Sequence, residues 1–136
     1  MSKIVTFDQA KRLQTLGISI VSDCGYVGYT KSGELVSRRK FKEDKEYQTI
    51  PSWIRVFTVS EALDWIREEK GIDCCAFFNN ELFGNLDNAK AIYYFKYGCN
   101  GRMIYNSWNV DYKSFDTHSL AESALLDAVL TYLEKK

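Results

Sequence analysis

Residues 58–78 carry the clearest structural signal in the chain, a helix followed at once by a strand. Thr58 and Glu61 stand three residues apart, the spacing of a capping box in which each side chain accepts a hydrogen bond from the other's backbone N–H. Apolar residues then recur at helical spacing until Gly71, a residue type that commonly ends helices. The short apolar run 72–78 follows, and it predicts the central strand of a sheet.

Two further helices begin with the same kind of signal. Thr6 and Gln9 form a second capping box and predict a helix over about residues 7–16. Ser119 and Glu122 repeat the spacing and predict a last helix capped by Ser119. Its apolar residues cover more than half of the helix circumference, which favours burial on two sides or pairing. We therefore expect a symmetric homodimer through this helix, whose apolar residues are Leu120, Leu125, Leu126, Val129, Leu130, Tyr132 and Leu133.

The dipeptide Asn100-Gly101 predicts an antiparallel hairpin in which the aromatic-rich runs 91–97 and 103–110 are the two strands. Asn-Gly is the preferred dipeptide of a two-residue type I′ turn. Counting back from that turn places Tyr97 opposite Ile104 and Phe95 opposite Asn106, on the face better suited to a core. Tyr94 and Tyr105 then share the more polar face, where they could also contribute to an interface.

An earlier hairpin is predicted around Ser32-Gly33, with Tyr29 opposite Val36. The stretch 38–46 that follows is rich in charges and poor in apolar residues, so we interpret it as a solvated loop or strand extension. Its cluster of cations could instead hold a phosphate, although the acids after it dilute the positive charge.

Taken together, these elements predict a single α+β domain over residues 1–136, with an antiparallel sheet of four to five strands packed by two to three helices. The 18 Lys and Arg residues balance 18 Asp and Glu residues, so general nucleic-acid binding is disfavoured. No 18-residue apolar run is present, and we expect no membrane span.

Cysteine and histidine usage argues against a metal centre. The four cysteines form no C-x-x-C pair, and His118 is the one histidine, so we expect reduced, buried thiols, no metal and no cofactor in a cytoplasmic protein. Nucleotide-binding loops, nucleophile elbows and zinc-protease motifs are missing from the sequence. His118 at a helix start could act as a neutral base, but nothing in the pattern indicates an enzyme.

Three segments of the chain cover all three predicted helices: TFDQAKRLQTLGI at 6–18, IPS at 50–52 with TVSEALDWIREEKGI at 58–72, and LAESALLDAVLTYL at 120–133. They resemble a family of small, uncharacterised proteins from Bacteroidetes phages and prophages. The similarity lies in helix caps and helix faces rather than in catalytic residues. The resemblance implies an origin in a phage or prophage, and hence the cytoplasm of a bacterial host.

Two functions follow as hypotheses. The first is an accessory protein that acts by binding a protein partner or a second copy of itself. The second is a small-ligand binder, such as an anti-defence protein that sequesters a nucleotide signal. In that case Tyr94 or Tyr105 would stack on the base, and Arg38, Arg39 or Arg102 would hold the phosphate.

Overall fold

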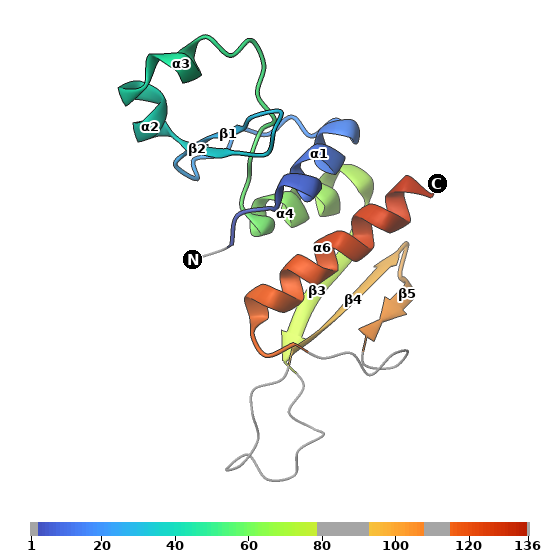
Figure 1. The fold of residues 1–136 in the computed structure, drawn as a ribbon. Helices are drawn as coiled ribbons and strands as arrows, with labels where there is room; N and C mark the ends of the chain where they lie inside the picture. Colours follow the sequence, from blue (N-terminus) through green and yellow to red (C-terminus); the bar gives the residue numbers. More distant parts are fainter. Residues whose placement is uncertain (1–2, 79–92, 108–114, 136) are drawn as a thin grey trace. The chain divides into compact units, whose positions relative to one another are not determined.

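The computed structural model of the protein describes residues 3–78, 93–107 and 115–135 (Figure 1). Its contacts divide the chain into an N-terminal unit, Ser2–Ala62, and a C-terminal unit, Leu63–Lys136. Helices and antiparallel strands confirm the α+β prediction, but the strands form one sheet of two and one of three instead of a single larger sheet. A single domain over the whole chain stays a prediction.

Helix α1 (Phe7–Thr15) opens the N-terminal unit as expected. The backbone N–H of Gln9 donates to Thr6 Oγ1 over 3.1 Å, and the backbone N–H of Thr6 donates to Gln9 Oε1 over 3.0 Å. The predicted capping box is therefore confirmed. Leu13 is fully buried on the inner side of the helix.

Strands β1 (Tyr26–Tyr29) and β2 (Leu35–Ser37) form the first hairpin, with a register that differs from the prediction. Tyr29 lies opposite Leu35 and not opposite Val36. The turn is longer than two residues because Thr30 closes it: its N–H donates to the carbonyl of Glu34 over 2.9 Å, and its Oγ1 accepts from the N–H of Glu34.

Two short helices replace the loop that we predicted for residues 38–46. They are α2 (Arg38–Glu43) and α3 (Lys45–Gln48). Each begins at a polar cap, since Ser37 Oγ accepts from the N–H of Lys40 and Asp44 Oδ1 accepts from the N–H of Glu46. The prediction was wrong because it weighed the lack of apolar residues and overlooked these caps.

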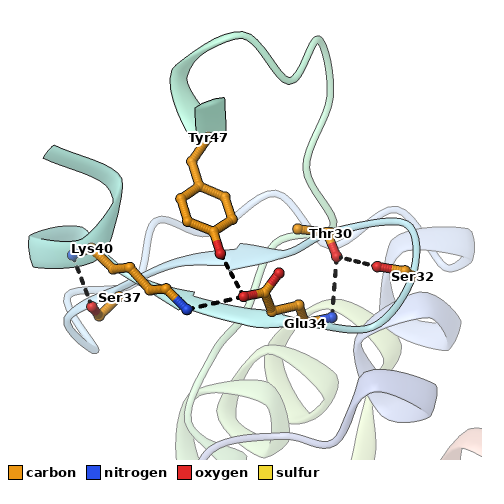
Figure 2. Close-up of polar contacts among 6 residues, drawn as sticks. All are labelled: Thr30, Ser32, Glu34, Ser37, Lys40 and Tyr47. Atoms are coloured by element: carbon orange, nitrogen blue, oxygen red, sulfur yellow. Dashed lines mark hydrogen bonds and ion pairs between the residues drawn. The ribbon is translucent and has the colours of Figure 1, made fainter. Parts of the chain in front are cut away.

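Glu34 fastens both short helices to the hairpin, as Figure 2 shows. Its carboxylate accepts hydrogen bonds from the Tyr47 hydroxyl over 2.6 Å and from Lys40 Nζ over 3.0 Å. The pKa of Glu34 is lowered below its ordinary value, most strongly by the hydrogen bond from Tyr47 and next by the one from Lys40. Trp53 packs beside Tyr47, with 6.4 Å between the ring centroids.

An extended segment near residues 53–58 adds further pairing in the N-terminal unit. Ile54 exchanges two backbone hydrogen bonds with Tyr29, of 2.8 and 3.0 Å. The N–H of Val5 donates to the carbonyl of Phe57 over 2.9 Å. Val56 and Phe57 are almost fully buried, so this segment runs through the core of the unit.

Helix α4 (Val59–Lys70) begins at the predicted capping box. The N–H of Glu61 donates to Thr58 Oγ1 over 3.1 Å, and the N–H of Thr58 donates to Glu61 Oε1 over 3.0 Å. The last residues of the helix enter the C-terminal unit, where Gly71 takes a φ of +65° before the strand begins.

The C-terminal unit contains strands β3 (Ile72–Phe78), β4 (Tyr93–Cys99) and β5 (Arg102–Asn106) in the order β3-β4-β5 (Figure 1). The strand 72–78 is present where it was predicted, but it lies at an edge, and β4 is central. The predicted strand residues 91–92 and 108–110 lie outside the described residues.

Helix α6 (His118–Glu134) lies across one face of this sheet (Figure 1). Its Tyr132 ring packs against Tyr97, and its His118 ring packs against Tyr93, with centroids 5.7 Å apart in both pairs. The cap is Thr117, whose Oγ1 accepts from the N–H of Leu120, so the expected cap at Ser119 was wrong by two residues.

The β4–β5 turn has the predicted form, with positive φ at both Asn100 (56°) and Gly101 (75°). A β-bulge after the turn changes the register, since Gly98 pairs with Met103 and Tyr97 pairs with Tyr105. Ile104 is the extra residue. The glycine permits this arrangement, because a Cβ at Gly98 would collide with the carbonyl oxygen of Arg102.

Candidate functional site

The five residues predicted to bind a ligand are distributed over both units. Arg38 and Arg39 lie in α2 of the N-terminal unit, and both are exposed. Arg38 Nη1 lies 3.3 Å from Asp23 Oδ1, and Arg39 Nε lies 3.1 Å from Glu43 Oε1. Their charges are thus partly balanced by neighbouring carboxylates.

The two tyrosines proposed as a base-stacking pair lie on opposite faces of the three-stranded sheet. The bulge turns Tyr105 to the face that α6 covers, where its ring stacks between Phe95 and Tyr97 at 5.4 and 5.7 Å. Tyr94 is on the other face and is only 3% exposed, and burial raises its pKa. The predicted shared face was wrong because a one-residue bulge reverses the side-chain alternation.

Arg102, the fifth predicted residue, lines a hollow of about 380 Å³ at the turn end of the sheet, here called the anion pocket. The lining takes residues from both faces of the sheet: Cys74 and Tyr97 are on the α6 side, and Asp73, Cys75, Lys96 and Gly98 alternate with them. A volume of this size is in the range of small-molecule sites. The lining residues are Arg67, Asp73, Cys74, Cys75, Lys96, Tyr97, Gly98, Gly101, Arg102 and Met103.

Three cations from three different elements meet at the anion pocket. Arg67 comes from α4, Lys96 from the middle of β4, and Arg102 from the first position of β5. Asp73 is the one carboxylate among the lining residues, which leaves them a formal charge of +2. Such an excess of positive charge in a hollow attracts anions.

Arg67 is held in place by two hydrogen bonds. Its Nε donates to the main-chain carbonyl of Cys74 over 2.9 Å, and its Nη1 donates to Asp64 Oδ1 over 2.6 Å. This ion pair balances part of the guanidinium charge, and it contributes little stability because the Asp64 side chain is largely exposed. The orientation of Arg67 is therefore fixed before a ligand arrives.

Lys96 and Arg102 make no ion pair within the part of the chain that the structure describes. Lys96 Nζ lies 5.4 Å from the centroid of the Phe77 ring, which gives it a cation–π contact. Arg102 begins β5 just after the turn, where it is exposed. Both charges remain available to an incoming anion.

The two adjacent thiols of β3 differ in exposure. Cys74 is buried, and burial raises the pKa of its thiol to about 11 despite the nearby Arg67. Cys75 is half-buried, lines the anion pocket and lies opposite Lys96 in the sheet. All four cysteines are free, as predicted, but only Cys74 is buried.

Sequence reasoning missed Arg67 and Lys96. Arg67 lies within the predicted helix before Gly71, and no pattern in the sequence shows that it reaches β3. Lys96 did give a signal, because it is the one charged residue in a strand of aromatic and small residues. A charged residue at such a position indicates either a solvent-exposed face of the sheet or a binding site.

Two general features of the described residues bear on function. Among these residues, no cluster of His, Cys, Asp and Glu side chains could hold a metal ion. No helix in those parts of the chain is long and apolar enough to cross a membrane.

Helix α6 is buried more fully than expected: Leu125, Leu126, Val129 and Leu130 are inaccessible within one chain. The homodimer stays a prediction, but its original argument no longer holds.

Comparison of the chain with protein-family models, with curated proteins and with solved structures finds no match. The resemblance to phage and prophage proteins therefore remains a prediction. The function has to be argued from the anion pocket itself.

Proposed function

We propose that the protein binds a small phosphate-bearing molecule in the anion pocket. The observation that supports this most strongly is the convergence of Arg67, Lys96 and Arg102 from three elements on one hollow. Guanidinium groups match phosphate oxygens with paired hydrogen bonds, and a lysine adds a compact charge. Binding, without catalysis, is the activity that these groups support.

The size and lining of the pocket define the ligand further. About 380 Å³ is enough for a molecule of the size of a mononucleotide. The Tyr97 ring is engaged with Tyr105 and Tyr132, so a base would gain little from stacking on it. The phosphate, more than the base, is then the recognised group, and sugar phosphates and nucleotides both belong to the proposed class.

The proposal includes a biological setting. A phosphate-binding protein in the cytoplasm of a phage-infected bacterium could sequester a nucleotide signal, which is the second hypothesis from the sequence. The free thiols at Cys24, Cys74, Cys75 and Cys99 support a reducing compartment. The protein would act by lowering the free concentration of its ligand.

A thermal-shift panel tests the proposal. The panel contains phosphate, pyrophosphate, linear and cyclic mononucleotides, and a sugar phosphate, each at low ionic strength. A ligand at one hundred times its Kd stabilises the folded state by about 2.7 kcal/mol. We expect at least one such shift in the wild type.

Two matched variants assign the site. Arg102→Gln removes a pocket cation whose side chain makes no hydrogen bond or ion pair within the described residues, so it should keep the fold and lose most of the shift. Arg39→Gln removes an exposed arginine of α2 and should leave the shift unchanged. If no compound stabilises the protein, or if Arg102→Gln is stabilised as much as the wild type, the proposal fails.

A further inference from the structure

A second arginine-lined hollow lies within the N-terminal unit, apart from the residues of the anion pocket. Its volume is about 320 Å³. Two arginines, Arg38 and Arg55, line this hollow. Val56 and Phe57 among the lining residues are 4% and 1% exposed, whereas Val21 is 87% exposed. Apolar residues beside two cations are a different chemistry from that of the anion pocket. The apolar lining residues are Ile20, Val21, Tyr26, Val27, Val56 and Phe57.

Arg55 is distinguished by its contacts. Four of the six arginines of the chain have an ion pair in the structure, with the carboxylates of Asp8, Asp23, Glu43 and Asp64. In the described residues, Arg55 and Arg102 have none, and each lines a hollow. An arginine that has no carboxylate partner and lies beside apolar residues is suited to bind the carboxylate of a ligand.

The backbone around Arg55 is fixed on both sides. Ile54 is hydrogen bonded to Tyr29, and the carbonyl of Phe57 accepts from the N–H of Val5. These bonds fix the backbone on both sides of Arg55. The hollow is therefore preformed, which lowers the entropic cost of binding.

The side chain of Arg38 can exchange its present ion-pair partner, Asp23, for a ligand. Its guanidinium donates to Asp23 Oδ1 and to the carbonyl of Ser22, both over 3.3 Å. The Asp23 side chain is 98% exposed, so this pair contributes little stability in water. A ligand carboxylate can replace Asp23 without disrupting the fold.

We propose that this hollow binds an amphipathic organic anion, a carboxylate attached to an aliphatic or aromatic body. The carboxylate would pair with Arg55 and Arg38, and the apolar body would lie against the more exposed apolar lining residues, such as Ile20 and Val21. A bare phosphate lacks the apolar body and gains nothing from these residues. The site is therefore independent of the phosphate site proposed above.

The experiment is an NMR titration of the full-length, nitrogen-15-labelled protein with decanoate below its micelle concentration. We expect saturable shifts at the amides of Tyr26, Arg55 and Phe57. Decan-1-ol, which has the same chain without the charge, should bind about tenfold more weakly, since each 1.4 kcal/mol changes affinity tenfold. Pyrophosphate, which can pair with the arginines but lacks the apolar body, should bind here more weakly than decanoate.

Variants complete the test. Arg55→Gln should weaken decanoate binding by about tenfold, and Arg55→Lys, which keeps the charge but not the paired donors, by less. Arg102→Gln should bind decanoate like the wild type. The proposal is overturned if decanoate shifts none of these amides, if decan-1-ol binds as tightly, or if Arg55→Gln binds unchanged in a protein whose amide spectrum shows an intact fold.

Discussion

Arg67 donates a hydrogen bond from Nε to the main-chain carbonyl of Cys74 over 2.9 Å, and so joins helix α4 to the edge strand β3. The bond leaves the guanidinium at the wall of the anion pocket. A structural contact and a ligand-binding group are thus combined in one side chain. Substitution at Arg67 should affect both properties.

Arg67→Met is the direct test of that dual role. We expect a loss of about 1 kcal/mol in the free energy of unfolding, the typical contribution of one hydrogen bond, together with weaker phosphate binding. Urea denaturation measures the first effect, and titration of the folded variant measures the second. Arg102→Gln serves as the control, since it should weaken binding with little change in stability. Equal behaviour of the two variants in urea would contradict the structural role of Arg67.

The thiols of β3 report the charge of the pocket without a ligand. In a Cys24→Ser, Cys99→Ser background, we expect Cys75 to react and Cys74 to stay protected, because burial raises the pKa of Cys74 to about 11. Each stopped-flow labelling rate of Cys75 is divided by the rate of the same methanethiosulfonate with a free thiol, because a thiolate intrinsically reacts faster with a cationic reagent. The normalised rate should be higher for the reagent with a sulfonate group than for the one with a trimethylammonium group, and the quotient of the two is the ratio. Arg102→Gln should lower it, and a ratio below one in the parent protein would contradict a cationic pocket.

Acid should release α2 and α3 from the first hairpin. Hydrogen bonds from Tyr47 and Lys40 lower the pKa of Glu34, so the carboxylate stabilises the folded state above pH 4.5, its ordinary pKa. That contribution is lost as the pH falls through the lowered pKa of the folded state. The Trp53 indole N–H signal, followed by NMR, should shift over this acid range. In Glu34→Gln the same transition should be missing, and an unchanged transition would assign it to another group.

Gly98→Ala tests the bulge in β4–β5. The added Cβ meets the carbonyl oxygen of Arg102, so the strands must move apart or change register. We expect a loss of about 1–3 kcal/mol, the usual cost of overpacking. Thermal denaturation gives the stability, and near-UV circular dichroism reports the Tyr97–Tyr105 stack. A variant as stable as the wild type, with an unchanged aromatic signal, would show that the bulge does not require glycine.

Much of the secondary structure was predictable because it depends on neighbouring residues. The capping boxes at Thr6 and Thr58 and the turn at Asn100-Gly101 are present in the structure as the sequence indicates. Each needs only residues within one turn of helix or hairpin. Helices α2 and α3 also begin at local capping residues. The cap at Ser37 is a sequence signal from which α2 could have been predicted.

The candidate site was much less predictable. Arg102 was named from the sequence, but the register of β5 depends on a contact between Gly98 and the backbone after the turn. That one bulge moves Tyr105 away from Tyr94 and removes the predicted stacking pair. The role of Arg67 depends on where helix α4 ends relative to β3, which no local pattern specifies.

The proposed phosphate site rests on Arg67, Lys96 and Arg102 acting together. An NMR titration of the nitrogen-15-labelled protein with pyrophosphate at low ionic strength tests it. We expect saturable shifts at the amides of Lys96, Gly98 and Arg102, with a Kd that rises about tenfold in Arg102→Gln and stays unchanged in Arg39→Gln. No saturable shift at these amides, or the same Kd in Arg102→Gln as in the wild type, would contradict it.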